Sequence, residues 1–299
     1  MSFSKKFNFV AGFKIANLFS LALFLSAIIL VFFKGLNLGI DFKGGTLIEL
    51  RVDPKSVNIS QIRSSFMKMD LGDLNVKEFG TQGDYLIKFE KKNININIQN
   101  IKNNIQKDLQ TDINFRRVES VGPKVSDELL ESGLIAIALS LGAMLFYIWV
   151  RFEWQFSIGS IIAIFHDVLI TIGLFSLLSL EINLSIVAAV LTIVGYSMND
   201  TVVIYDRIRE NLSKYSSLKI DEISNISIND TISRTIITSV TTLLALISIF
   251  ILGGEILRGF AFAMIIGVLI GTYSSIYVAT PILKYFNVSY KSISKDSKN

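Results

Sequence analysis

One carboxylate, Asp200, stands near the end of an otherwise apolar stretch that runs from Asn183 to Tyr205. A stretch of this length is about what a helix needs to cross a lipid bilayer, and an ionisable side chain inside such a helix costs roughly 2.5 kcal/mol or more. A group with that cost is expected to have a partner or a task. Asn199 lies beside it, so the segment predicts a polar site at membrane depth that takes up and releases a proton.

A second candidate lies in the preceding apolar stretch, Phe156–Leu180, where His166 and Asp167 are adjacent near the middle. Thr171 follows Asp167 by one helical turn and would lie on the same face, close enough for a hydrogen bond. These side chains are a second candidate for proton coupling. The alternative is a satisfied structural pair that takes no part in transport.

A third candidate is Arg234, which opens the apolar stretch Thr235–Leu252. A nearby cation favours the ionised form of a carboxylate and desolvation opposes it, so an Asp200–Arg234 pair would gain or lose a proton as it is broken or made. Such a pair could couple proton passage to motion. Two alternatives stay open: Arg234 can snorkel to the membrane surface, and the Ser and Thr side chains of these stretches can join helices without conducting protons.

The elements that must hold these residues are membrane helices. The chain has 299 residues, of which 51% are hydrophobic and 18% charged, a composition typical of a protein with several spanning helices. Apolar stretches of spanning length predict six helices, at Ile15–Phe33, Leu129–Val150, Phe156–Leu180, Asn183–Tyr205, Thr235–Leu252 and Phe260–Leu283. The first is predicted to be a retained helix and not a secretory signal, because no small-residue cleavage site follows it.

The distribution of Lys and Arg predicts that both termini are cytoplasmic. With that orientation the short loops on the other side hold only Arg258, and the long segment 34–128 is left out because large domains cross regardless of charge. The cytoplasmic side then receives Lys5, Lys6, Lys14, Arg151, Arg207, Arg209, Lys214, Lys219, Arg234, Lys284, Lys291, Lys295 and Lys298. The net charge of +4 follows from this topology, and no nucleic-acid partner is implied.

The residue types also limit the chemistry. The chain has no Cys and one His, which excludes disulfides, thiol catalysis and thiolate metal sites and leaves little for a metal cluster. No arrangement of a nucleophile with a base is present, so we expect neither an enzyme nor a cofactor. Gly39, Gly44 and Gly45 predict a tight turn, and Gly267 with Gly271 predicts close packing of the last helix against a neighbour.

The segment between the first and second helices, residues 34–128, is long enough to form a domain with its own core. Its alternating and helical patterns follow the order βαββαβ, which is typical of an α+β ferredoxin-like sandwich. The predicted strands are Thr46–Val52, Asn75–Phe79, Tyr85–Phe89 and Ile113–Val118, and the predicted helices are Ile59–Met69 and Ile98–Leu109. The alternating run Asn93–Asn97 is compatible with a short strand or an extended linker.

The remaining segments are polar. Residues 129–284 hold the second to sixth helices, and within them 206–233 is predicted to be a cytoplasmic loop that is either solvated or partly an amphipathic helix on the membrane surface. Residues 285–299 are rich in Lys and Ser and are predicted to form a disordered cytoplasmic tail.

Several motifs, in one order and over nearly the whole chain, resemble the SecF family. This family comprises the smaller membrane subunits of the bacterial SecDF accessory translocase, which are related to the RND (resistance-nodulation-division) transporters. The motifs are Gly39–Thr46, Val121–Pro123, Arg151–Trp154, Phe165–Asp167, Gly195–Asn211, Ser233–Thr235, Leu257–Phe260 and Gly271–Ser275.

The resemblance implies an RND-like bundle of six transmembrane helices in the bacterial inner membrane, with a periplasmic domain after the first. It implies pairing with SecD and use of the proton-motive force to help draw secreted polypeptides out of the SecYEG channel, with YajC and SecA as further partners. It also implies that Asp200 and Arg234 match positions tied to proton movement. The candidate proton-coupling residues are therefore Asp200, Arg234, Asn199, Asp167 and His166.

Two other functions compete with this one. Half of an RND-type small-molecule efflux pump would share the helices, but such pumps usually carry two large periplasmic domains in one long chain. A membrane scaffold without proton use would leave Asp200 unexplained. The compact extramembrane domain also favours SecF over SecD, whose corresponding domain is larger.

Overall fold

The computed structural model describes residues 7–53, 57–90 and 98–290, with the backbone alone at Glu255 and Ile256. The run Asn93–Asn97 and residues 291–299 lie outside this range, so the predictions for them are not tested. The predicted disordered tail is wrong for residues 285–290, because Val288 is buried in the bundle core and its backbone N–H donates to the carbonyl of Leu283. The chain divides into two compact units, each described by itself. One unit comprises Met1–Asn37, Ala136–Leu180 and Ser185–Asn299, and the other comprises Leu38–Ile135 and Glu181–Leu184.

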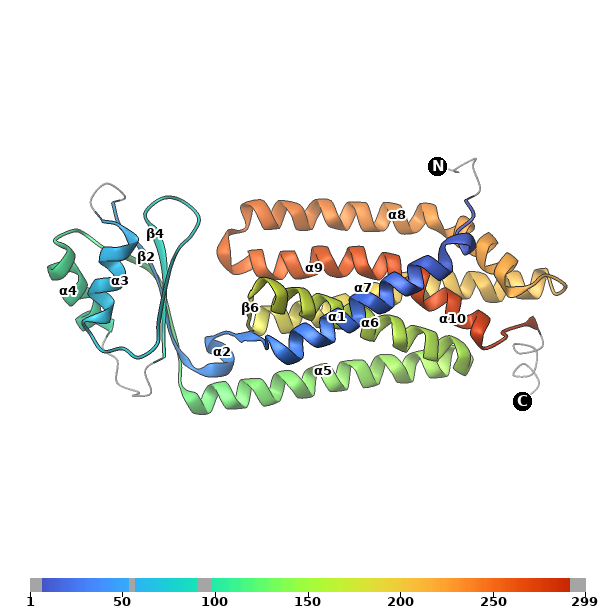
Figure 1. The fold of residues 1–299 in the computed structure, drawn as a ribbon, viewed down its shortest axis with the longest axis horizontal. Helices are drawn as coiled ribbons and strands as arrows, with labels where there is room; N and C mark the ends of the chain where they lie inside the picture. Colours follow the sequence, from blue (N-terminus) through green and yellow to red (C-terminus); the bar gives the residue numbers. More distant parts are fainter. Residues whose placement is uncertain (1–6, 54–56, 91–97, 291–299) are drawn as a thin grey trace. The chain divides into compact units, whose positions relative to one another are not determined.

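Long helices make up the first unit, and six in the described residues are long and apolar enough to cross a membrane, as predicted (Figure 1). They are α1 (Phe13–Phe33), α5 (Pro123–Arg151), α6 (Trp154–Leu178), α7 (Leu184–Lys214), α8 (Ile220–Leu252) and α9 (Gly254–Ser274). A short 3-10 turn, η1 (Val10–Gly12), precedes α1. The last span continues from α9 through the π-helical turn η2 (Ser275–Ala279) into α10 (Thr280–Tyr285).

The predicted cytoplasmic loop 206–233 is wrong in extent. Helix α7 continues to Lys214 and α8 begins at Ile220, which leaves five residues, 215–219, between them. Neither the solvated loop nor the surface helix forms, because the segment folds back on itself as a helical hairpin. Asn211 Nδ2 donates to Ser227 Oγ across it at 2.9 Å, and Arg207 pairs with Asp230 at 2.8 Å. The apolar residues Ile208, Leu212, Ile223 and Ile228 are buried in the bundle core.

Helices α7 and α9 approach closely, which confirms the packing predicted from the small residues of the last helix. A side chain at Gly267 would collide with Ile193, and one at Gly271 would lie 3.0 Å from Ser197 Cβ. Glycine at these two positions therefore brings the backbone of α9 against the part of α7 that carries the polar residues.

The second unit has the predicted βαββαβ order. Its elements are β2 (Gly45–Arg51), α3 (Ile59–Met67), β3 (Leu74–Glu78), β4 (Asp84–Phe89), α4 (Ile98–Leu109) and β5 (Asn114–Val121). The sheet is antiparallel in the order β3-β4-β2-β5, which is the ferredoxin-like arrangement, and α3 and α4 cover one face (Figure 1). Helix α3 begins at Asn58 with a capping box, in which Asn58 and Gln61 exchange side-chain to backbone hydrogen bonds of 3.0 and 2.8 Å.

The sandwich core lies between that face and the two helices. On the strands it contains Ile48, Leu50, Ile87 and Phe89, and on the helices Ile62, Phe66, Ile101 and Ile105. The strand residues alternate with more exposed positions, and the helix residues recur at three- and four-residue spacing, so the sequence pattern and the burial agree.

The predicted glycine turn also forms. Gly44 and Gly45 have φ values of 75° and 132°, which side chains other than glycine rarely adopt, and they follow the short helix α2 (Ile40–Lys43). The sequence analysis missed a small two-stranded sheet, β1 (Asn37–Leu38) with β6 (Glu181–Ile182), since two-residue strands leave no alternating pattern to detect.

A buried carboxylate joins the strands on the face of the sheet opposite the helices. Asp84, whose side chain is 4% exposed, accepts from Arg51 through both oxygens at 2.5 and 2.6 Å and from Thr81 Oγ1 at 2.8 Å. Arg116 on β5 lies 3.3 Å away. The hydrogen bond from Arg51 is the main cause that lowers the pKa of the Asp84 carboxyl below its ordinary value.

This network predicts acid sensitivity in the sheet. A carboxyl whose pKa is lowered by folding adds stability above its unfolded pKa, about 3.9, and that stability is lost as the pH falls through the folded value. We therefore expect the β4 amides of the full chain to lose protection against hydrogen exchange, relative to the intrinsic exchange rate at each pH, as the pH falls below about 3.9. In Asp84→Asn they should exchange faster at neutral pH and lose most of that acid dependence. A variant with the wild-type pH profile would contradict the assignment, and Asp73→Asn serves as the control.

Candidate functional site

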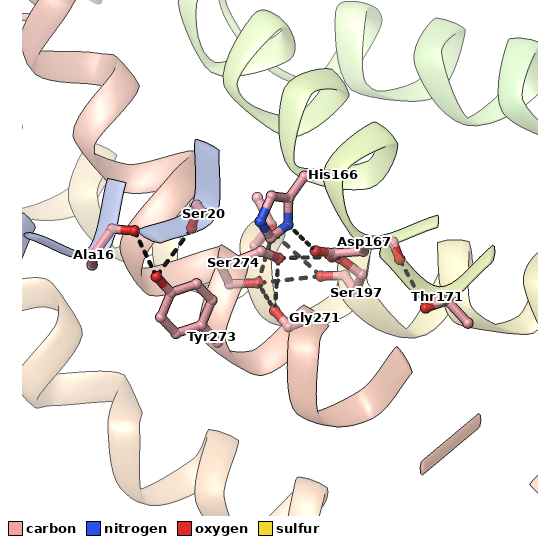
Figure 2. Close-up of polar contacts among 11 residues, drawn as sticks. Ala16, Ser20, His166, Asp167, Thr171, Ser197, Gly271, Tyr273 and Ser274 are labelled. Atoms are coloured by element: carbon pink, nitrogen blue, oxygen red, sulfur yellow. Dashed lines mark hydrogen bonds and ion pairs between the residues drawn. The ribbon is translucent and has the colours of Figure 1, made fainter. Parts of the chain in front are cut away.

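Asp167 is the centre of a buried hydrogen-bond network between three helices (Figure 2). Its side chain on α6 is fully buried. Oδ2 accepts from Ser197 Oγ on α7 at 2.5 Å and from Ser274 Oγ on α9 at 2.7 Å, and Oδ1 lies 2.8 Å from His166 Nδ1. Apart from His166, no cation forms an ion pair with Asp167 within the described residues. The carboxylate is thus held by hydroxyls and one imidazole, all of them sensitive to whether it carries a proton.

His166 connects this network to the first helix. The ring is 5% exposed, and Nε2 has no hydrogen-bond partner in the described part of the chain. The ring lies roughly parallel to that of Tyr273, with centroids 6.5 Å apart. Tyr273 in turn donates to the carbonyl of Ala16 at 2.8 Å and accepts from Ser20 Oγ at 3.0 Å, both on α1 (Figure 2).

Asp200 on α7 takes part in a separate set of contacts, with Thr272 of α9 and, through Thr272, with Ser239 of α8. Its side chain is buried, with the residue 3% exposed. Thr272 Oγ1 donates to Oδ2 at a long 3.4 Å, and Ser239 on α8 lies 2.8 Å from the same hydroxyl. This confirms a buried acid on α7 with a polar companion, as the sequence predicts. The single long hydrogen bond holds the carboxylate loosely.

The predicted contact between Asp200 and Arg234 is not present in the structure. Arg234 is exposed and, within the described residues, forms no ion pair with Asp200, although the two charged groups are near enough to interact electrostatically. The neighbour of Asp200 on α8 is Ser239 through Thr272, five residues beyond Arg234. Five residues turn a helix by about 500°, which places Arg234 about 140° away from that face.

Two further candidates lie away from the contacts expected of them. Asn199 is exposed, because one residue along α7 is a turn of about 100° from the buried face that holds Asp200. Thr171 is buried but donates to the backbone carbonyl of Asp167 at 2.8 Å and not to its carboxylate. Thr238 and Thr241 on α8 likewise bond to carbonyls of their own helix. These hydroxyls therefore bond within their own helices, and the hydrogen bonds described here do not join neighbouring helices.

Both networks depend on hydroxyls at the end of α9 and the start of η2, which were not predicted from the sequence. Four consecutive residues carry these hydroxyls: Thr272, Tyr273, Ser274 and Ser275. Thr272 contacts α7 and α8, Tyr273 contacts α1, Ser274 contacts α6, and Ser275 contacts α7. Ser275 Oγ lies 2.8 Å from Thr201 Oγ1 and donates to the carbonyl of Gly271 at 2.8 Å. The available signal was a run of four hydroxyl residues inside an apolar span, which entered only as part of a family motif. Within the described residues, no group of His, Asp and Glu side chains is arranged to hold a metal ion.

Comparisons with known proteins give one consistent result. The family model "Protein export membrane protein SecD/SecF, C-terminal" matches residues 101–289, and the model "SecD/SecF GG Motif" matches residues 29–55. Protein translocase subunit SecF of Rickettsia rickettsii is 44% identical over 283 residues, covering 94% of this chain and 92% of that protein. The SecF subunit of Cereibacter sphaeroides is 43% identical over 290 residues, covering 94% and 89%.

The fold is similar to that of solved SecDF structures. The crystal structure of SecDF from Thermus thermophilus, described as a translocon-associated membrane protein, has a TM-score of 0.85 at 36% identity. It is matched over 95% of this chain, which covers 39% of that longer chain. A crystal structure of SecDF in a super-membrane-facing form has a TM-score of 0.72 at 35% identity.

Proposed function

Because the chain belongs to the SecF family of protein translocase subunits, we propose that it uses the proton-motive force to promote polypeptide export, in a complex with SecD. The observation that carries the proposal is the buried carboxylate of Asp200 in α7. An ionised carboxylate at membrane depth is costly and a neutral one is not, so gain and loss of a proton would alter how α7, α8 and α9 pack. Proton passage would thereby be tied to movement of helices.

The proposed proton-coupling set is Asp200, Arg234, Asn199, Asp167 and His166. Asp200 and the pair His166–Asp167 would bind protons at two places separated by α9. Arg234 already acts electrostatically on Asp200 without forming an ion pair, so direct pairing of the two is proposed for another stage of the cycle. Asn199 is retained because it adjoins Asp200, although its side chain is exposed.

The proposed setting is the bacterial inner membrane with both termini in the cytoplasm. The Lys and Arg distribution supports this orientation. The SecDF match supports SecD as the direct partner, since this chain covers 39% of a protein whose description includes both names. SecYEG, SecA, YajC and the secreted polypeptide are proposed as the further partners. The relatives named here are protein translocase subunits, and no observation favours the alternative of a small-molecule efflux pump.

The test is export in vesicles that contain the SecYEG channel, SecA and this chain with its SecD partner. After co-purification has shown that the two bind, export is measured with a proton gradient and again with an uncoupler. We expect the complex to raise export when the gradient is present and to lose most of that stimulation without it. Equal stimulation in both conditions would contradict the proton-driven mechanism.

A further inference from the structure

Near its C-terminal end, which leads into the second unit, α1 packs closely against α6 and is joined to it by hydrogen bonds. Ser176 Oγ bonds to the carbonyls of Leu30 and Gly35 at 3.1 and 2.7 Å, and Lys34 Nζ donates to the carbonyl of Leu177 at 2.6 Å. One to two turns earlier, Gly173 leaves so little space that an added Cβ would lie 2.5 Å from that of Ala27. The chain enters the second unit at Leu38, directly after these contacts.

Nearer its start, α1 forms two hydrogen bonds with one side chain of α9, that of Tyr273. The phenol hydroxyl uses both of its roles on α1, as donor to Ala16 O and as acceptor from Ser20 Oγ. Ser20 is buried, and both hydrogen bonds are partly buried. The ring of the same tyrosine lies beside the ring of His166 and roughly parallel to it, and this imidazole lies against Asp167 (Figure 2).

The hydrogen bonds at Asp167 have a second possible arrangement, which uses Ser274 and Gly271 of α9, the helix that carries Tyr273. Ser274 Oγ has one hydrogen and two acceptors within reach, Asp167 Oδ2 at 2.7 Å and the carbonyl of Gly271 at 3.1 Å. If the carboxyl gains a proton, Ser274 can turn to Gly271, whereas an ionised carboxylate draws it back. Ser274 is the last residue of α9 before the π-helical turn Ser275–Ala279, a geometry that often marks functional sites.

We propose that Tyr273 is a positioning residue that joins α1 to the His166–Asp167 centre, so that a change of charge in this centre shifts α1 relative to α9. The proposal rests on the proton use proposed above. Asp167 acts on Tyr273 through Ser274, the next residue in the chain, and His166 acts on it through the neighbouring ring. Because the hydroxyl of Tyr273 bonds to Ala16 and Ser20, movement of Tyr273 would move α1, the helix that precedes the second unit in the chain.

The other titratable groups nearby do not provide this link. On α7, Asp200 is turned toward Thr272, and on η2 the Tyr277 ring meets Phe13 edge-on with centroids 6.1 Å apart. The basic residues of α1, Lys14 and Lys34, lie at its two ends. The charge that changes beside Tyr273 is therefore that of His166 and Asp167.

The test measures the distance between α1 and α9 by spin labelling. The chain has no Cys, so cysteines placed at Phe19 and Leu269, which are exposed on α1 and α9, give one labelled pair. Distances are recorded in the full chain with its SecD partner in lipid vesicles, over a series of pH values from alkaline to acidic. We expect a pH-dependent shift in wild type, its loss in Tyr273→Phe and Asp167→Asn, and its retention in Tyr277→Phe.

A shift that persists unchanged in Tyr273→Phe, or a wild type without any shift, would overturn the inference. If Tyr273→Phe does not insert into the membrane, Ser20→Ala is used in its place. This variant removes the hydrogen bond from Ser20 to Tyr273 and should reduce the pH-dependent shift in distance. Export measured in parallel separates the two proposals. Gradient-dependent export without movement of α1 contradicts this inference alone, and Tyr273-dependent movement without gradient-dependent export contradicts the proposed function alone.

Discussion

Asp200→Asn is expected to abolish the part of export that depends on the proton gradient while the chain remains inserted in the membrane. The amide has nearly the shape of the carboxyl and can still accept from Thr272, but it cannot gain or lose a proton. Export should therefore fall to the level seen with an uncoupler. The measurement is export in paired vesicles with and without a gradient, with membrane content of the variant checked by immunoblot.

Asp206→Asn is the matched control, since Asp206 lies six residues further along α7 and forms an exposed pair with Arg151 at 3.0 Å. Exposed pairs contribute about 0–1 kcal/mol, so this variant should export normally. Arg234→Met in the same assay separates the two roles of the arginine. Loss of gradient-dependent export favours pairing with Asp200 during the cycle, and unchanged export favours snorkelling. Normal stimulation in Asp200→Asn would remove the basis of the mechanism.

Asp167→Ala is expected to weaken the helix bundle itself. The substitution leaves the hydroxyls of Ser197 and Ser274 and the imidazole of His166 without their shared acceptor, in a site with no exposed surface. A buried polar group without a partner costs about 1–3 kcal/mol, and Ser274 can recover part of that loss through the Gly271 carbonyl. We expect a loss of about 3 kcal/mol in the free energy of unfolding, measured by denaturant titration in detergent.

Thr171→Val gives the control for that measurement. Thr171 is buried one turn from Asp167, but its hydroxyl bonds to a carbonyl of its own helix, which keeps its normal helical partner when the hydroxyl is removed. Its loss should be under about 1 kcal/mol. An Asp167→Ala chain as stable as Thr171→Val would show that the network contributes little to folding.

Local patterns predicted the elements well. The strands and helices of the second unit were found because each alternates or repeats within a few residues, and the ferredoxin-like order followed from their sequence. The loop 206–233 was misjudged because the features that make it helical are contacts between α7 and α8, such as Asn211 with Ser227, and not a property of either segment alone.

The acids of the site were predicted, and the hydroxyls of Thr272, Tyr273 and Ser274 on α9 were missed. A charge inside an apolar stretch is visible in one sequence, which is why Asp167 and Asp200 were identified. Ser and Thr are common in membrane helices, and Ser274 gains its meaning from Asp167, 107 residues earlier. The absent Asp200–Arg234 contact has a related cause, because the sequence does not specify the rotation of α8 about its axis. That rotation brings Ser239 to the Thr272 hydroxyl beside the acid and leaves Arg234 exposed, without an ion pair to Asp200.

The hairpin of α7 and α8 is longer than the membrane is thick. At 1.5 Å per residue, the 31 residues of α7 and the 33 of α8 measure about 46 and 50 Å, against a hydrocarbon layer of about 30 Å. Some ten residues of each helix therefore extend beyond the hydrocarbon layer as a continuation of the part that holds the acid. A tilt of a few degrees in the lipid becomes a displacement of a few ångströms at the tip, so a soluble protein that touches the tip would respond to tilting of these helices without entering the bilayer.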